Sequence, residues 1–321
     1  MQRLALNRHL VLGRAGMDLY ADPPGTEIPQ ATRFVSHLGG SAANIAVALT
    51  RQGAKTALLT RLSDDAVGRF CLAQLDAYGI DRRLVTLTGN ESRTSLAVVE
   101  TRLENCQSVI YRNQAADLAL TPEDVAQTDF SQYDSLIITG TALAQDPSRT
   151  AAMQALTKAK AAGLVTIMDV DFRPYSWPST AEARDINLAA ARLCDIVVGN
   201  DVEFGLLAGD MEQGLTIARQ LVADTAQIAV YKRGELGAVT ITPTEEFTSG
   251  IYRTQALKPT GAGDAFMGGF LAALARGQTP HDATLRGSAN AAMVVARVGC
   301  APAMPTAAEL DAFLATHPAP I

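Results

Sequence analysis

The chain has 321 residues, of which 48% are hydrophobic and 19% charged, and its formal net charge is −6. This composition supplies a large core and excludes intrinsic disorder, and the acidic balance without a long basic run argues against a nucleic-acid partner. No apolar run is long enough to cross a bilayer and residues 1–9 lack a signal-peptide segment, so we expect a cytoplasmic protein with no membrane partner. Cys71, Cys106, Cys194 and Cys300 are widely spaced and are expected to be free thiols.

The first third of the chain alternates strands and helices but contains additional strands. Periodicity predicts a strand at 9–14, a helix at 41–52, a strand at 56–62 and a helix at 65–78. Segments 32–37, 95–99 and 108–112 read as further strands of a small β-sheet lid, inserted at about 14–38 and 93–114. Asp18 is expected just past the end of the first strand, at the sheet edge where ligands collect; an ordinary turn aspartate is the alternative.

From residue 133 the alternation becomes regular. Strands are predicted at 136–138, 165–168, 196–198, 229–232 and 238–242, and helices at 147–162, 180–193, from 200 onward, at 279–298 and at 306–316. Strands alternating with helices of this length predict the α/β class, with a mainly parallel central sheet and helices on both faces. We expect one domain over residues 1–321 that carries the small lid.

Residues 258–266, Lys-Pro-Thr-Gly-Ala-Gly-Asp-Ala-Phe, predict a glycine-rich turn that opens directly onto a helix. Gly261 and Gly263 allow the backbone to approach a ligand, and the free N–H groups of a helix start suit phosphate oxygens. Asp264 would repel a phosphate, so we interpret it as a base that stays ionised and takes a proton from a hydroxyl while the amides hold the transferred group. A simple helix cap is the alternative.

A second glycine-rich helix start lies at 39–44, Gly-Gly-Ser-Ala-Ala-Asn. Ser41 is expected to cap this helix, and Asn44 follows one turn later, where its amide needs partners. Two such helix starts suggest two faces of one site, although an ordinary tight strand–helix turn is the alternative.

These motifs, together with Asn200 and Glu203 between them, resemble the ribokinase-like (phosphofructokinase B-type) carbohydrate kinases over nearly the whole chain. The resemblance implies phosphorylation of a hydroxyl by ATP with Mg²⁺, in which Asp264 is the base and Gly261, Ala262 and Gly263 form the anion hole. It assigns Asp18, Gly39, Gly40 and Asn44 to the substrate, and Asn200, Lys232, Gly234, Gly237, Thr260 and Asn290 to the nucleotide. Glu203 is assigned to Mg²⁺ through water.

Segments 111–118, 140–149 and 169–177 are most similar to family members that act on a keto-deoxy sugar acid. The carboxylate of such a substrate calls for bidentate arginines, and we assign this role to Arg112 and Arg173. An ion pair of Arg173 with Asp169 or Asp171 is the alternative. A kinase of another keto-deoxy sugar acid, a neutral-sugar or nucleoside kinase, and a non-catalytic regulatory binder remain alternative functions.

The chain departs from the family pattern two residues before Thr260. Many relatives carry an aspartate there that helps to hold a monovalent cation, whereas this chain has Lys258. The departure predicts little or no activation by K⁺. The edge strand of the lid further predicts a homodimer, or a higher homo-oligomer, formed through the lid.

Overall fold

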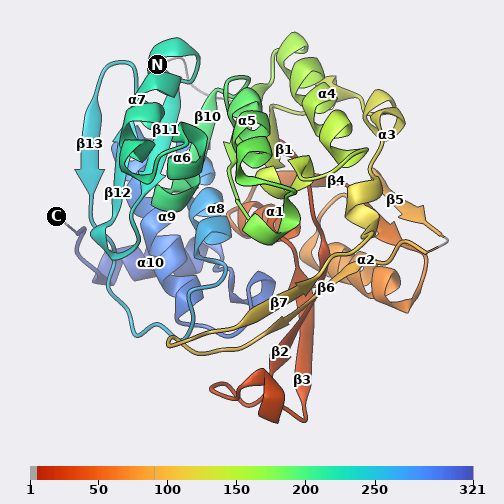
Figure 1. Cartoon of the computed structure of the whole chain (residues 1–321). Helices are drawn as coiled ribbons and strands as arrows, with labels where there is room; N and C mark the ends of the chain where they lie inside the picture. Colours follow the sequence, from red (N-terminus) through yellow and green to blue (C-terminus); the bar gives the residue numbers. More distant parts are fainter. Residues whose placement is uncertain (1–5, 90, 321) are drawn as a thin grey trace.

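The computed structural model describes residues 6–89 and 91–320, and within them a nine-stranded sheet forms the centre of the protein (Figure 1). Its strands are β1 (Arg8–Leu12), β4 (Lys55–Ser63), β5 (Val85–Thr88), β8 (Ser135–Thr139), β9 (Val165–Asp169), β10 (Ile196–Asn200), β11 (Ile228–Lys232), β12 (Ala238–Ile241) and β13 (Glu246–Ser249). The spatial order is β13-β12-β11-β10-β9-β8-β1-β4-β5, parallel throughout except for β12 and β13. The prediction of a mainly parallel α/β sheet is confirmed.

Helices cover both faces of this sheet. One face carries α1 (Ser41–Arg51), α2 (Ala66–Tyr78), α8 (Ala262–Ala275) and α9 (Pro280–Val295), with α10 (Ala307–Thr316) beside α9; the other carries α3 (Pro122–Ala126), α4 (Ser148–Ala161), α5 (Thr180–Ala191), α6 (Asp201–Ala208) and α7 (Gly214–Asp224). Strand residues alternate between the two layers: Leu10 and Leu12 join one buried cluster and Val11 the other. In the described residues, no helix combines the length and apolarity that a bilayer crossing requires.

Helix α8 lies at the centre of its layer, between α1 and α9, and two glycines permit this close packing. A Cβ on Gly268 would lie 2.4 Å from Ala48 Cβ of α1. A Cβ on Gly269 would lie 2.7 Å from the Arg286 carbonyl oxygen of α9. The glycines therefore serve helix packing, which brings the N-terminal ends of α1 and α8 together.

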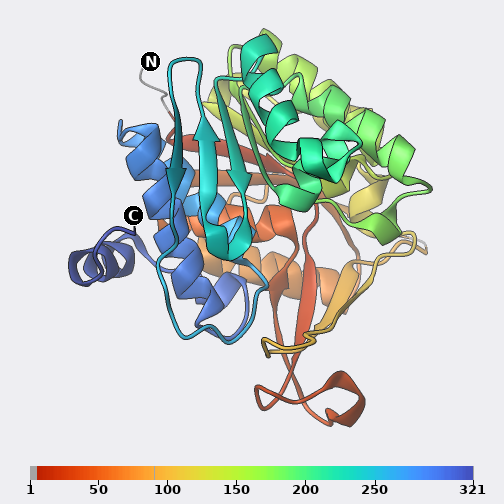
Figure 2. The ribbon, with the colours of Figure 1, turned by 60° about the vertical axis from the view of Figure 1, so that its left-hand side comes forward.

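A second sheet of four strands, which we call the lid, projects from one side of the central sheet (Figures 1 and 2). Its strands are β2 (Gly16–Ala21), β3 (Phe34–Gly39), β6 (Ser95–Val99) and β7 (Ser108–Tyr111), in the order β3-β2-β6-β7. Asp18 belongs to β2, so its expected position just past a central strand was wrong: after β1 the chain turns at residues 13–15 and enters the lid. The face of the lid that carries Asp18 and Tyr20 looks into a cleft.

Candidate active site

A cleft of about 1060 Å³ lies between the lid, the carboxyl ends of the central parallel strands and the N-terminus of α8. Most of the predicted site residues line it: Asp18, Gly40, Asn44, Arg112, Arg173, Asn200, Glu203, Lys232, Gly234, Gly237, Thr260, Gly261, Ala262, Gly263 and Asp264. These residues come from segments far apart in the sequence, and the fold brings them to one edge of the sheet, as expected for a parallel α/β protein.

Two predicted residues do not line the cleft. Asn290 is fully buried in α9, and its amide donates to the Ala265 carbonyl at 2.6 Å, so it fastens α9 to α8. Gly39 lies against Asp18, where a Cβ would come within 2.0 Å of the carboxyl carbon. Both residues lie behind the cleft lining, against residues that border the cleft or continue the helix that does.

The two glycine-rich helix starts meet at Asp264. The Asn44 amide of α1 donates to Asp264 Oδ2 of α8 at 2.9 Å, a contact across 220 residues of sequence. Gly40 and Gly261, with φ of 95° and 84°, are the N-caps of the two helices, so Ser41 is the first residue of α1 and not its cap as predicted. Gly40 adopts this role because a Cβ there would lie 2.4 Å from the Arg14 carbonyl oxygen.

Burial changes the acidity of Asp264. Loss of hydration, reinforced by the charge of Asp171, raises its pKa from 3.8 to about 7, although Asn44, Arg173 and Lys232 oppose the rise. The expectation that a helix N-terminus keeps this aspartate fully ionised was therefore wrong, because desolvation outweighs the helix dipole. A pKa near neutrality suits a general base.

The first turn of α8 offers backbone donors beside a cation. Gly261, Ala262 and Gly263 line the cleft, and a Cβ on Gly263 would lie 3.3 Å from Lys232 Nζ. Helix-start amides and an ammonium group together can hold the charge of a phosphoryl group. Asp264, one residue further along the helix, lies within the same turn.

Two more carboxylates lie near the ends of β9 and β10, those of Asp169 and Glu203. Burial raises the pKa of Asp169, a rise that Lys232 opposes and the charge of Glu203 reinforces. Glu203 is oriented by backbone amides: Oε2 accepts from Asn200 N at 2.6 Å and Oε1 from Phe172 N at 3.3 Å. Burial also raises the Glu203 pKa, again against the Lys232 charge. The Lys232 ammonium thus lies close enough to both carboxylates to oppose the rise in their pKa.

The arginines are held in different ways. Only 8% of the Arg112 side chain is exposed. It donates to the Asp117 carboxylate and through Nη2 to the Thr141 carbonyl at 3.0 Å, while its buried Nη1 has no hydrogen-bond partner among the described residues. Arg173 is half-exposed and pairs with Asp171 at 2.9 Å, which was the alternative weighed for it. Although burial favours the neutral acid, Arg173 and further hydrogen bonds lower the pKa of Asp171.

Arg14 was not among the predicted site residues. Arg14 is buried in the cleft wall and donates to Ser95 Oγ of the lid at 2.9 Å. Burial raises the pKa of Asp18, and the charge of Arg14 opposes this rise. The only available signal was its position between the first strand and Asp18. Asp171, whose φ is 34°, was noted only as a partner of Arg173.

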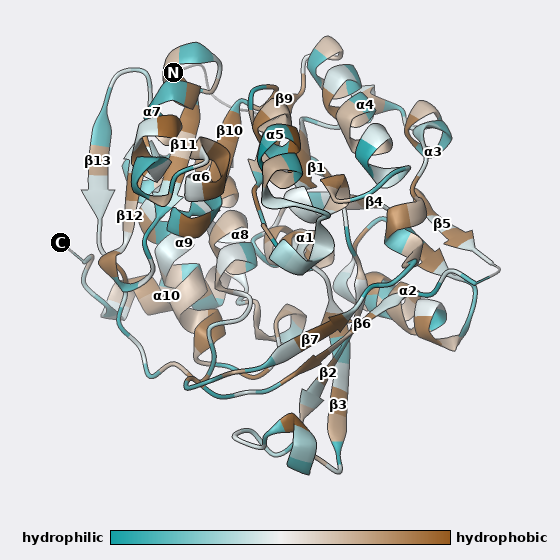
Figure 3. Ribbon diagram, viewed as in Figure 1, coloured by the Kyte–Doolittle hydropathy of each residue, from teal (hydrophilic) through white to brown (hydrophobic). Residues whose placement is uncertain are grey.

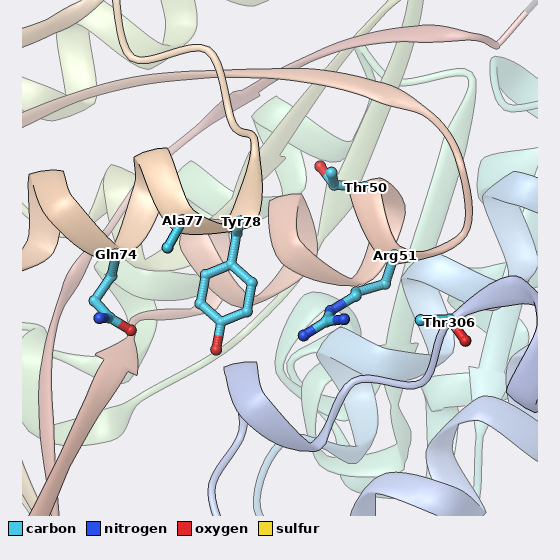
Figure 4. Close-up of a pocket in the computed structure, with 6 residues that line it drawn as sticks. All are labelled: Thr50, Arg51, Gln74, Ala77, Tyr78 and Thr306. Carbon is cyan, nitrogen blue, oxygen red and sulfur yellow. The ribbon is translucent and has the colours of Figure 1, made fainter.

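A second pocket of about 470 Å³ lies between α1, α2 and the start of α10 (Figure 4). Its lining consists of Thr50, Arg51, Gln74, Ala77, Tyr78 and Thr306, and the Arg51 guanidinium lies 5.5 Å from the centre of the Tyr78 ring. Because this lining offers no carboxylate to act as a base, the chemistry belongs to the larger cleft.

A carboxylate beside helix-start amides and an ammonium group, closed over by a lid, defines a kinase site for transfer of a phosphoryl group to a hydroxyl. The chain belongs to the pfkB family of carbohydrate kinases, whose family model matches residues 7–307. It is 39% identical over 314 residues to 5-dehydro-2-deoxygluconokinase of Photobacterium profundum, covering 96% of this chain and 95% of that protein. It is 34% identical over 313 residues to the protein of the same name from Geobacillus kaustophilus, covering 96% and 93%.

Solved structures of related kinases share the fold. The aminoimidazole riboside kinase of Salmonella enterica, complexed with aminoimidazole riboside and an ATP analogue, has a TM-score of 0.82 at 26% identity and covers 97% of this chain and 100% of its own. A fructokinase double mutant of Vibrio cholerae O395, bound to fructose, ADP and potassium, has a TM-score of 0.85 at 27% identity and covers 97% and 99%.

Proposed function

We propose that this chain is an ATP-dependent kinase that phosphorylates the 6-hydroxyl of 5-dehydro-2-deoxygluconate, a sugar acid of myo-inositol breakdown. Similarity over nearly the full length to kinases named for this substrate supports the reaction. The observation that carries the choice of a sugar acid is Arg112, a buried guanidinium in the cleft with an unpaired Nη1. A buried donor without a partner is costly, so the site favours a ligand that supplies an acceptor, as a carboxylate does.

In the proposed reaction Asp264 accepts the proton of the substrate's O6 hydroxyl. The O6–Pγ bond forms as the bond between Pγ and the bridging oxygen of ATP breaks, and ADP leaves. The Asn44 amide, 2.9 Å from Asp264 Oδ2, holds the carboxylate in place, and the amides of Gly261, Ala262 and Gly263 with Lys232 stabilise the transferred group. Because proton transfer from an alcohol comes late, a base with a pKa near 7 is adequate.

Mg²⁺ bound to the ATP phosphates would neutralise their charge during transfer. Within residues 6–89 and 91–320 no cluster of three or more His, Cys, Asp or Glu side chains is placed to hold a metal, so the ion would take its ligands mainly from phosphate and water. Glu203, fixed by two backbone amides, and the neighbouring Asn200 are the residues we assign to those waters. Asp169, buried on the same wall, fits the same role.

Arg112 and Arg173 are assigned to the substrate carboxylate, with Asp18 and Asn44 on its hydroxyls. The Arg173–Asp171 pair is compatible with this role, because a guanidinium has five donors and this one is half-exposed toward the cleft. A 2-dehydro-3-deoxygluconate kinase is the second candidate, since its substrate also pairs a keto group with a carboxylate.

Turnover of ATP with a panel of sugar acids and neutral sugars tests the proposal. We expect 5-dehydro-2-deoxygluconate to give the highest kcat/KM, and consumption of a neutral ketose alone would refute the sugar-acid assignment. Arg112→Ala and Arg173→Ala should each raise KM for the acid at least tenfold while KM for ATP stays within about twofold. Arg219→Ala, which removes an exposed arginine paired with Glu246, is the matched control.

We also infer that two copies associate through the outer face of the lid. Strands β6 and β7 are largely hydrophobic (Figure 3). The strand register places Leu19, Phe34, Val98, Val109 and Tyr111 on the outer face together with Ser36, and Phe34, Val109 and Tyr111 are 40%, 44% and 60% exposed. An exposed apolar face on a sheet with unpaired edge strands suits a two-fold symmetric contact, in which both copies use the same surface. Phe34→Lys should halve the mass measured by light scattering; an unchanged mass, or a monomeric parent protein, would refute this assembly.

A further inference from the structure

Lys258 is a buried ammonium directly beneath the phosphate-binding turn. Its side chain has no exposed surface, and its Nζ donates to the Thr260 carbonyl at 2.6 Å and reaches the Val294 carbonyl of α9 at 3.5 Å. Within the described residues it forms no ion pair, so its hydrogen bonds go to backbone carbonyls. Burial lowers the pKa of Lys258, while the neighbouring acidic groups of Cys300 and Asp264 oppose this change.

Such an arrangement requires an explanation, because burying an ammonium without a carboxylate partner is costly. The position of Val294 accounts for part of the stabilisation. It lies in the last turn of α9, where unpaired carbonyls and the negative end of the helix dipole favour a cation. The other hydrogen bond of the Lys258 ammonium goes to the carbonyl of Thr260, the residue just before the predicted anion hole.

The geometry of the Thr260–Gly261 peptide links this contact to the active site. The peptide is trans, so its carbonyl and its N–H point in opposite directions. Because the Thr260 carbonyl accepts from the Lys258 ammonium, the Gly261 N–H points away from that ammonium, and both residues border the cleft. Gly261 has little freedom to shift, since it lies against Cys300 and Val294: a Cβ there would meet Cys300 Sγ at 2.8 Å.

We propose that Lys258 is a positioning residue whose ammonium acts as a built-in monovalent cation, holding the Thr260–Gly261 peptide so that the Gly261 N–H faces the transferred phosphoryl group. This role rests on the proposed phosphotransfer and predicts that the enzyme needs no monovalent cation from solution.

Three variants test this role. Lys258→Ala opens the carbonyl site, Lys258→Met fills it without a charge, and Lys160→Ala removes an exposed lysine whose Nζ likewise reaches a backbone carbonyl, that of Leu193 at 3.4 Å.

The wild-type kcat should be the same in K⁺ and tetramethylammonium buffers. Lys258→Ala should lose about 100-fold in kcat in tetramethylammonium with KM for ATP nearly unchanged, as on loss of one anion-hole donor. K⁺ or NH₄⁺ should restore at least tenfold, whereas Lys258→Met should not respond and Lys160→Ala should behave as wild type.

Thermal unfolding gives a readout that does not depend on turnover. K⁺ should raise the Tm of Lys258→Ala, by binding the vacated carbonyls, and leave the wild-type Tm unchanged. A folded Lys258→Ala with wild-type kcat in tetramethylammonium would refute the role. So would several-fold activation of the wild type by K⁺, a result that can be obtained even if the variants do not fold. Wild-type protein without activity on any sugar acid would instead count against the proposed function, and the Tm comparison would still decide the role of Lys258.

Discussion

Replacing Asp264 by Asn should remove most of the activity and, at the same time, stabilise the fold. The new side chain is nearly the same size and can still accept from the Asn44 amide, so the geometry of the two helix starts should be retained. It cannot take up the hydroxyl proton, and loss of a general base typically lowers kcat by about 10²–10⁴-fold. KM for ATP should change little.

The gain in stability follows from the raised pKa. A change from 3.8 to about 7 corresponds to an upper limit of ~4 kcal/mol against folding when the carboxylate is fully ionised. Asp264 keeps some contact with cleft water, so we expect about half of this limit. A raised carboxyl pKa destabilises the fold above that pKa, and the effect fades as pH falls from 7 toward 3.8. Asp264→Asn should therefore be more stable than wild type by ~2 kcal/mol at pH 8 and by less than ~1 kcal/mol at pH 5.

Chemical denaturation at the two pH values, together with steady-state kinetics, measures both effects. The exposed Asp224→Asn on α7 is the control and should change neither. An Asp264→Asn protein that is inactive but less stable at pH 8 would show that the carboxylate is held by favourable contacts, which would refute the reasoning from desolvation. Full activity of Asp264→Asn would refute the assignment of the base.

Three further predictions concern other parts of the molecule. The wild-type kcat/KM for the sugar acid should rise with pH through about 7, since Asp264 must be ionised in the free enzyme to accept a proton, and a flat profile between pH 5.5 and 8.5 would contradict this. Gly268→Ala should lower the free energy of unfolding in urea by about 1–3 kcal/mol through its clash with α1, whereas Gly89→Ala, which meets no atom within 4 Å, should not. Asp117→Asn should weaken the hold on Arg112 and raise KM for the sugar acid about tenfold without a change in KM for ATP; an equal rise in both would indicate a general loss of structure.

The residue pattern by itself determined the succession of most strands and helices and the two glycine-rich helix starts. These features are local: the alternation of apolar residues and the backbone freedom of glycine act over a few neighbouring residues, so the segments 95–99 and 108–112 were located within a residue. The short strands β5 and β13 and the helices α3 and α7 were not predicted. Their type depends on packing against distant strands as much as on local periodicity.

Only the tertiary structure decided how the site residues meet and what state they are in. Asn44 donates to Asp264, a residue 220 positions away in the sequence. Arg14 donates to Ser95 of the lid, and Asn290 donates to the Ala265 carbonyl of α8 instead of lining the cleft. The pKa of Asp264 could not be predicted from its place at a helix start, since desolvation depends on every group that surrounds the carboxylate. The orientation of a peptide bond and the pKa of a carboxyl group both depend on the groups that surround them in space. The sequence shows directly only which residues are neighbours along the chain.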